Sequence, residues 1–177
     1  MEENKKTHWR RNDFRLKSLF MIVDGLQKSI KELEKNLTEI HWYDADWLMQ
    51  ETEPIYGLAF IAFQNYIIGS IADIDGTSQN KHAFFKKDRA IDGYAFTTIE
   101  LITTLANYAK HKDEKLLQGT TTILDGFKLN YKDVIYLDEA AIFQGLDILD
   151  KDWDLFKIQD YVTVWRESLW ISMECQN

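Results

Sequence analysis

Apolar side chains recur every three or four residues over two long stretches, the spacing that places them on one face of a helix. Residues 13–40 are therefore predicted as a long amphipathic first helix, and residues 158–173 as the last helix. The apolar positions are Leu19, Val23, Leu26, Ile30, Leu33, Leu37 and Ile40 in the first stretch and Ile158, Tyr161, Val162, Trp165, Leu169 and Met173 in the last. Both helices are expected to bury these faces.

A third stretch, residues 55–72, carries no charge over about the minimum length that spans a membrane. Gln64 and Asn65 interrupt its middle, both flanks are acidic, and no cluster of Lys or Arg sets an orientation. We therefore expect the buried central helix of a soluble bundle, running to about Ile74. Pro54 precedes the stretch, where a first-turn proline is tolerated or a helix is kinked.

The remaining elements are shorter or weaker. Residues 75–93 have turn residues at both ends and five basic side chains, which predicts a loop with a short helical piece. A helix is predicted to start with Thr97 or Thr98 as its cap and to bury Ile99, Ile102, Leu105, Ala106 and Ala109. Helix signals weaken from Gln118, "KDVIYL" is a candidate extended piece, and Asp138 is a candidate cap of a short helix to about Leu149.

These patterns predict one all-α domain spanning residues 1–177. The chain has one proline, eight glycines, long periodic segments, and no repeat or linker. At 177 residues it is long enough for one core and short for two. The expected architecture is a bundle of four main helices with one or two short ones.

Charge and cysteine content narrow the class of protein. A net charge of −8 argues against a surface dominated by phosphate binding, which needs clustered Lys and Arg. The single cysteine, Cys175, excludes an internal disulfide and a set of zinc thiolates. The N-terminal residues lack the apolar segment of a signal peptide, so a cytoplasmic protein without a membrane span is expected.

Several common chemistries have no motif in the chain. It contains no glycine-rich phosphate loop, no G-x-S-x-G elbow and no H-E-x-x-H, and no histidine follows a glutamate at the di-iron spacing. His41, Asp44 and Asp46 lie in one irregular stretch, "HWYDADW", for which a helix-end turn is favoured over a cation site. We expect no metal and no cofactor.

One polar stripe stands out on the helix that begins near Thr97. Its members fall three or four residues apart and so share a helix face: Glu100, Thr104, Asn107, His111 and Glu114. Lys110, Lys112 and Asp113 lie beside them and join the candidate binding residues. The stripe is interpreted either as a small polar groove near the basic loop or as a solvated helix end, where a protonated histidine gains from the helix dipole.

The hexapeptide "ANYAKH", residues 106–111, resembles part of the HEPN superfamily motif, which consists of an arginine, a polar residue, a few further residues and a histidine. Asn107 takes the polar position and His111 the terminal one, but Ala106 stands where the family has arginine. The resemblance implies a helical bundle that works as a homodimer, with two such helices facing each other over an RNA substrate. It also implies metal-independent RNA cleavage, in which the arginine stabilises phosphate charge and the histidine transfers protons. Alanine does neither, so Ala106 is interpreted as natural or as an inactivating substitution.

Three functions stay open from the sequence. The first is an RNA-directed HEPN-like protein of a bacterial antiphage defence or toxin–antitoxin system, acting weakly through Asn107, His111 and nearby lysines such as Lys110, or only when the arginine is restored. The second is a catalytically silent HEPN-like module that dimerises or binds a toxin or antitoxin partner, as an immunity factor does. The third is an unrelated small helical enzyme or binding protein that uses the carboxylates between residues 41 and 53.

Overall fold

The computed structural model describes residues 9–132 and 136–175. Over these residues all regular elements are helical, and β-pairing is limited to two isolated bridges. The α-helices are α1 (Leu16–Glu39), α2 (Ala45–Asp75), α3 (Lys81–Phe85), α4 (Thr98–His111), α5 (Gln118–Gly126), α6 (Ala141–Leu149) and α7 (Leu155–Glu174), with 3-10 turns η1 (Trp9–Arg11) and η2 (Leu137–Glu139). The all-α prediction is confirmed.

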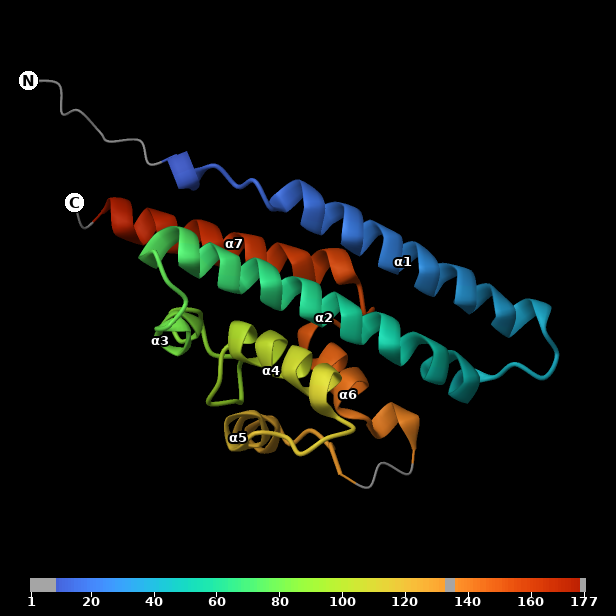
Figure 1. Cartoon of the computed structure of the whole chain (residues 1–177). Coiled ribbons are helices and arrows are strands. Elements are labelled where there is room, and N and C mark those ends of the chain that lie inside the picture. Colours follow the sequence, from blue (N-terminus) through green and yellow to red (C-terminus); the bar gives the residue numbers. More distant parts are fainter. Residues whose placement is uncertain (1–8, 133–135, 176–177) are drawn as a thin grey trace, which may run out of the picture.

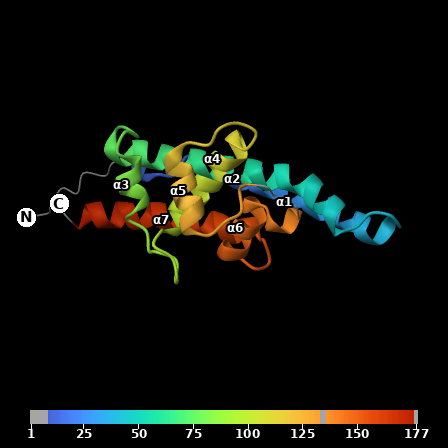
Figure 2. The same cartoon turned by 90° about the horizontal axis from the view of Figure 1, so that it is seen from below.

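The long helices α1, α2 and α7 run alongside one another as rods (Figure 1). The shorter helices α3 to α6 lie on the other side of α2, so that α2 is the centre of the bundle. Seen from below, α5 and α4 lie in front of α2 (Figure 2). The turn η1 and the C-terminal end of α7 lie at the same end of the molecule, where Arg11 donates to Glu174. The main packing partners of α2 are α4 on one side and α1 on the other.

Helix α2 starts nine residues before Pro54, which the sequence had placed near a helix start. Asp44 explains this because its carboxylate accepts hydrogen bonds from the backbone N–H groups of Asp46 and Trp47, both at 3.1 Å. The helix continues through Pro54 and ends at Gly76, whose positive φ of 74° suits a residue without a side chain. By length and composition α2 is apolar enough to cross a membrane, and half of its most apolar window is buried in the bundle.

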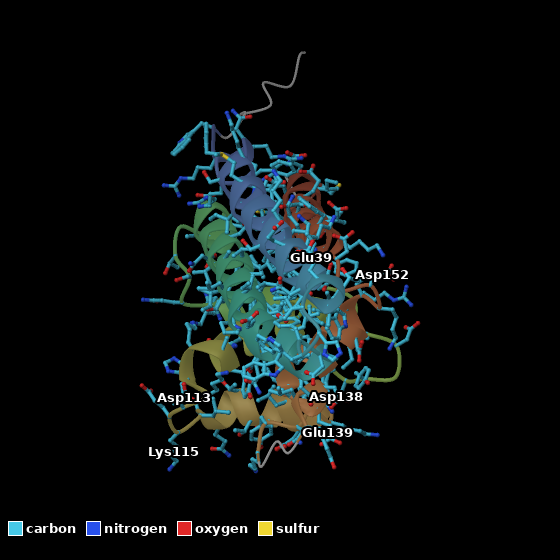
Figure 3. All side chains as sticks on the ribbon, turned by 90° about the vertical axis from the view of Figure 1, so that its right-hand side faces the viewer. Glu39, Asp113, Lys115, Asp138, Glu139 and Asp152 are labelled. Carbon is cyan, nitrogen blue, oxygen red and sulfur yellow. The ribbon has the colours of Figure 1, made fainter. Side chains whose placement is uncertain are left out.

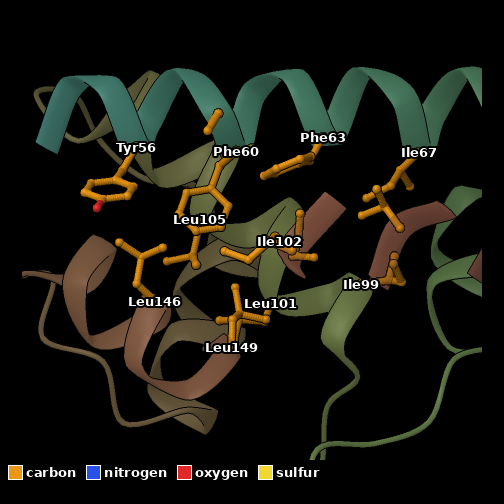
Figure 4. Close-up of a cluster of buried hydrophobic side chains, with 14 of the residues drawn as sticks. Tyr56, Phe60, Phe63, Ile67, Ile99, Leu101, Ile102, Leu105, Leu146 and Leu149 are labelled. Carbon is orange, nitrogen blue, oxygen red and sulfur yellow. The ribbon is translucent and has the colours of Figure 1, made fainter. Parts of the chain in front are cut away.

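The core is centred where α2, α4 and α6 meet. Phe60 and Phe63 of α2 pack with Ile102 and Leu105 of α4, and Leu146 of α6 closes the cluster (Figure 4). All five side chains are completely buried. Helix α4 therefore has the buried apolar face that the sequence predicted.

Helix α1 is much less buried than its apolar spacing suggested. Leu19, Val23 and Ile30 are buried, whereas Leu37 keeps 42% of its surface exposed. The expectation that the whole apolar stripe lies in the core is therefore wrong at the C-terminal end of the helix. The cause is the number of neighbours, because the first residue of α7, Leu155, lies beside Gln27 and the last turns of α1 extend beyond α7.

Three shorter features differ from the sequence-based prediction. Helix α5 forms where helix signals seemed weak, because it buries Thr120 and Leu124 beside α4. Asp138 lies inside the turn η2, and α6 begins after it at Ala141 without a side-chain cap. The candidate extended piece "KDVIYL" has its central residues 133–135 outside the described residues. The bundle thus has three short helices, α3, α5 and α6, where one or two were expected.

The segment before α1 is tied to the bundle by charged side chains. Asp13 accepts a hydrogen bond from the Tyr66 hydroxyl and lies 3.6 Å from Nε of the buried Arg166. Arg11 forms a bidentate ion pair with Glu167 of α7. Burial, together with the bond to Asp13, raises the pKa of Tyr66 well above its usual value. These contacts fix the start of the chain against α2 and α7.

Candidate functional site

Helix α4 carries the candidate site, and its first turn is fixed by a reciprocal cap. The Thr97 hydroxyl accepts a hydrogen bond from the backbone N–H of Glu100 at 3.1 Å. The Glu100 carboxylate in turn accepts the backbone N–H of Thr97 at 2.9 Å. This is a capping box, which satisfies two backbone donors that the helix itself leaves unpaired. Glu100, a candidate binding residue, therefore helps to start the helix and is buried.

Burial divides the polar stripe into two halves. Glu100 and Thr104 retain only 5% and 2% of their surface, whereas Asn107 is half-buried and His111 and Glu114 are exposed. The single exposed stripe expected from helical spacing is therefore incorrect for its first half. Spacing aligned Glu100, Thr104, Asn107 and His111 correctly along one side of α4, but it was wrong for Glu114, because the helix ends at His111. The packing of α2, α5 and α6 around α4 determines which of them solvent reaches.

Gln64 of α2 joins the second half of the stripe to the core. Its Nε2 donates to Asn107 Oδ1 at 2.9 Å and to the backbone carbonyl of Thr103 at 3.0 Å. Its Oε1 accepts a hydrogen bond from Lys110 Nζ at 2.6 Å. The side-chain amide of Gln64 thus forms hydrogen bonds with both candidate residues, Asn107 and Lys110, and holds them against α2.

The two helices approach closely enough for these bonds because of Gly57. A Cβ atom at this position would lie 3.1 Å from Ala109 Cβ, so a larger residue would push α2 and α4 apart. Lys110 is partly shielded by this close packing. Partial burial lowers the pKa of Lys110, and the nearby ammonium of Lys81 on α3 lowers it further.

The end of α4 carries an exposed histidine and carboxylate. His111 Nδ1 lies 3.3 Å from Glu114 Oε2, a pair in which the carboxylate orients the imidazole. Lys112 turns back to form a 2.8 Å ion pair with Glu53 of α2. Asp113 lies in the connection that follows α4, at the edge of the molecule (Figure 3). The pair of His111 and Glu114 is suited to proton transfer, but no cation-bearing side chain is bonded to it in the described residues.

Ala106, the position of the motif arginine, is completely buried. It lies on the face of α4 that also buries Ile102 and Leu105. An arginine side chain here would start inside the core and would have to leave it before its guanidinium reached a phosphate. The geometry therefore does not bring position 106 and His111 to a common surface.

Three of the four carboxylates between residues 41 and 53 are used in local structure. Asp44 caps α2, Glu51 accepts a 2.6 Å hydrogen bond from the Tyr43 hydroxyl, and Glu53 binds Lys112. Burial of the nearby Tyr108 raises its pKa to about 12, and Glu53 contributes to this rise. Across the described ranges, 9–132 and 136–175, no group of three or more His, Cys, Asp or Glu side chains is arranged to hold a metal ion.

A surface feature that the sequence did not reveal lies in the first third of the chain, which includes α1 and the first half of α2. Among the described residues, ten of the fifteen exposed large hydrophobic side chains fall between Trp9 and Leu58. They are Trp9, Phe14, Leu16, Phe20, Met21, Ile22, Leu37, Trp42, Trp47 and Leu58. A groove of about 450 Å³ runs between the two helices, lined chiefly by Leu19, Ile22, Leu26, Leu58, Ile61 and Ala62. The sequence pattern missed it because apolar spacing does not distinguish a core face from an uncovered one.

Comparison with protein-family models, curated proteins and solved structures found no match. The resemblance to the HEPN superfamily therefore rests on the six residues from Ala106 to His111 and on helical character. Function has to be argued from the geometry of this molecule.

Proposed function

We propose that the chain is a catalytically silent helical module that binds a protein partner through the outer side of α1 and α2. This outer α1/α2 face comprises Ser18, Ile22, Gly25 and Ser29 of α1 and Leu58, Ile61, Ala62 and Asn65 of α2. The observation that carries the proposal is the apolar groove between α1 and α2, with Ile22 and Leu58 about half exposed on its rim. Apolar patches of this kind on a folded domain typically mark interaction surfaces.

The polar stripe of α4 gives less support to an RNA-directed enzyme. Asn107 and Lys110 are already hydrogen-bonded to Gln64, and position 106 lies in the core. Cleavage by attack of an RNA 2′-hydroxyl needs a fixed cation near the phosphate in addition to a proton-transfer group. His111 supplies the second of these, and the cations beside it, Lys110 and Lys112, are already bonded to Gln64 and Glu53.

A photo-crosslinking experiment with a matched control tests the binding role. Ile22 and Ile171 are the same residue type with 49% and 50% of their surface exposed, but Ile171 lies on α7. A photoreactive amino acid is placed at either position in the full chain and activated in the cells that produce it. We expect a protein adduct from position 22 and none from position 171. Equal or absent crosslinking at the two positions would contradict the proposed function.

Catalytic silence is tested separately. Purified chain is incubated with single-stranded RNA in the presence of a metal chelator, beside the His111→Ala variant. We expect both proteins to leave the RNA intact. RNA cleavage that the His111→Ala variant loses would refute silence and favour the HEPN-like RNase hypothesis.

A further inference from the structure

We infer that the partner of the outer α1/α2 face is a second copy of this chain, with the two α1 helices antiparallel across a two-fold axis. The inference rests on the proposed function, because it names the occupant of the same surface. It differs from the dimer implied by the HEPN resemblance, in which the helices that carry the histidine motif meet. The observations that support it are the shape, the size and the charge of the face.

The shape of the face suits a helix. The groove between α1 and α2 is lined by apolar side chains, and Ile22 and Leu58 on its rim are each about half exposed. Two neighbouring helices present such a groove to a third, whose side chains pack into it as ridges. In a symmetric pair each α1 lies over the α1/α2 groove of the other copy, which gives an intermolecular bundle of four helices.

The size of the face suits a weak dimer. The uncharged face spans residues 18–29 of α1, a length of about 18 Å, and two adjacent helices are together about 20 Å wide. The face therefore offers roughly 360 Å² on each copy. A standard specific interface buries about 800 Å² on each partner, and smaller ones belong to weak, transient complexes. We therefore expect reversible association of the two copies.

The charge of the face favours a second copy over a charged partner. The chain has a net charge of −8, so two copies repel each other wherever acidic surfaces meet. The eight residues that define the outer α1/α2 face are all uncharged. Arg15, at the end of the groove, is paired with Asp73. Apart from this neutral pair at each groove, two such faces meet without burying a charge, whereas a basic partner would find no unpaired carboxylate among the eight residues.

Gly25 gives the expected crossing point of the two α1 helices. It lies near the middle of α1, and a Cβ atom built on it meets nothing within 4 Å. Ser18, Ile22 and Ser29 lie on the same side of the helix, three or four residues apart. The backbone of a second helix can therefore approach closely at Gly25, with Ile22 packing on either side of the axis.

Sedimentation velocity of the full chain between about 0.1 and 100 µM tests the inference. We expect a dimer that the Ile22→Glu variant converts to a monomer and that the matched Ile171→Glu variant leaves intact. Circular dichroism and thermal melting check that both variants keep their helices. If Ile22→Glu does not fold, Leu58→Glu gives the same test from α2. A wild-type monomer at 100 µM, or a dimer that resists both Ile22→Glu and Leu58→Glu, would overturn the inference.

Failure of this inference is distinguishable from failure of the proposed function. A monomer whose position 22 crosslinks to a different protein would remove the second copy and leave the binding role in place. Co-sedimentation of a monomeric chain with phosphatidylcholine vesicles, lost in Ile22→Glu, would assign the face to a lipid surface and overturn both. A crosslinked product of twice the mass of the chain supports both.

Cysteine crosslinking tests the pairing of the two α1 helices about Gly25. Helix axes about 8 to 10 Å apart bring facing Cα atoms within reach of a disulfide. In a Cys175→Ser background, Gly25→Cys is expected to form a covalent dimer on mild oxidation, and Val164→Cys on α7 is not. A chain that sediments as a dimer but gives no more covalent product with Gly25→Cys than with Val164→Cys would refute pairing about Gly25.

Discussion

Helices α1 and α4 are both amphipathic, but they are buried to very different extents. Helix α4 has 14 residues, of which nine are buried, including polar ones. Helix α1 has 24 residues, of which only Leu19, Val23 and Ile30 are buried. The difference comes from position, because α4 is surrounded by α2, α5 and α6 and α1 lies at the side of the bundle.

The two helices show that the same apolar periodicity can give either a buried helix or a helix with an exposed apolar side. In α4 it builds a core within one chain, and polar groups such as Glu100 and Asn107 are drawn into internal hydrogen bonds. In α1 it leaves apolar side chains exposed to solvent, where another molecule can bind them. Substitutions in α4 should therefore affect folding, and substitutions on the outer α1/α2 face should affect association.

Ala106→Arg is expected to have the largest effect on folding. Position 106 is completely buried, and an arginine confined there would be a buried charge without a partner. We expect a loss of at least about 3 to 5 kcal/mol, a large part of the stability of a domain of this size. Urea denaturation measures the loss. His111→Arg, at the exposed end of the same helix, is the control and should unfold like the wild type. A stable Ala106→Arg variant that cleaves RNA would instead support the HEPN-like hypothesis.

Leu105→Ala and Leu37→Ala compare the two helices with the same substitution. Leu105 is fully buried against Gly145 of α6, where an added Cβ would lie 2.5 Å from its Cδ1. Its truncation should cost about 2 to 5 kcal/mol. Leu37 is 42% exposed, so the same truncation should change the free energy of unfolding by less than about 1 kcal/mol. Both variants are measured at the same protein concentration. Equal losses in the free energy of unfolding would contradict the conclusion that α4 is more deeply buried than α1.

Gln64→Ala tests the hydrogen bonds that hold the polar stripe against α2. The substitution removes the partner of Asn107 Oδ1 and of Lys110 Nζ. We expect a loss of about 1 to 2 kcal/mol, since Asn107 is half-buried and Lys110 regains water. Gln50→Ala, the same substitution at an exposed position of α2 outside the outer α1/α2 face, is the control for helix propensity. If both variants have the same melting temperature, Gln64 does not stabilise the contact between α2 and α4.

Much of the helical architecture was predictable because it depends on local pattern. The apolar periodicity located α1 and α7 within a few residues, and Thr97 was recognised as a cap. The start of α2 was not predicted correctly. Pro54 is the more conspicuous signal in the sequence, but the helix begins at the Asp44 cap and continues through Pro54. Helix α5 was missed because its sequence is rich in threonine and its stability comes from packing on α4.

The candidate site was predictable as an alignment of side chains and not as a surface. Helical spacing placed Glu100, Thr104 and Asn107 on one side of a helix correctly. Which of them solvent reaches depends on residues far away in the chain, and Gln64 lies 43 positions before Asn107. The sequence marked Gln64 as unusual, because it interrupts an apolar run. It did not indicate that Asn107 and Lys110 are its hydrogen-bond partners. The exposed side of α1 had no local signal at all.

The smallest expected effect concerns the ion pair that ties the start of the chain to α7. The hydrogen bonds from the Arg11 guanidinium lower the pKa of Glu167 below its usual value of about 4.5. A carboxylate with a lowered folded-state pKa stabilises the fold above its unfolded pKa, and this contribution is lost as the pH falls through the folded value. Both side chains are partly exposed, so Glu167→Gln should cost less than about 1 kcal/mol at pH 7.

The difference between wild type and Glu167→Gln should therefore shrink as the pH is lowered below about 4.5. Urea denaturation at a series of pH values from 7 to 3 measures it. In an Arg11→Met background, Glu167 has lost its main partner, so the same substitution should show little dependence on pH. A difference that grows at low pH would reverse the sign of the argument. A difference that persists unchanged in the Arg11→Met background would assign the effect to packing on α7 instead of the ion pair.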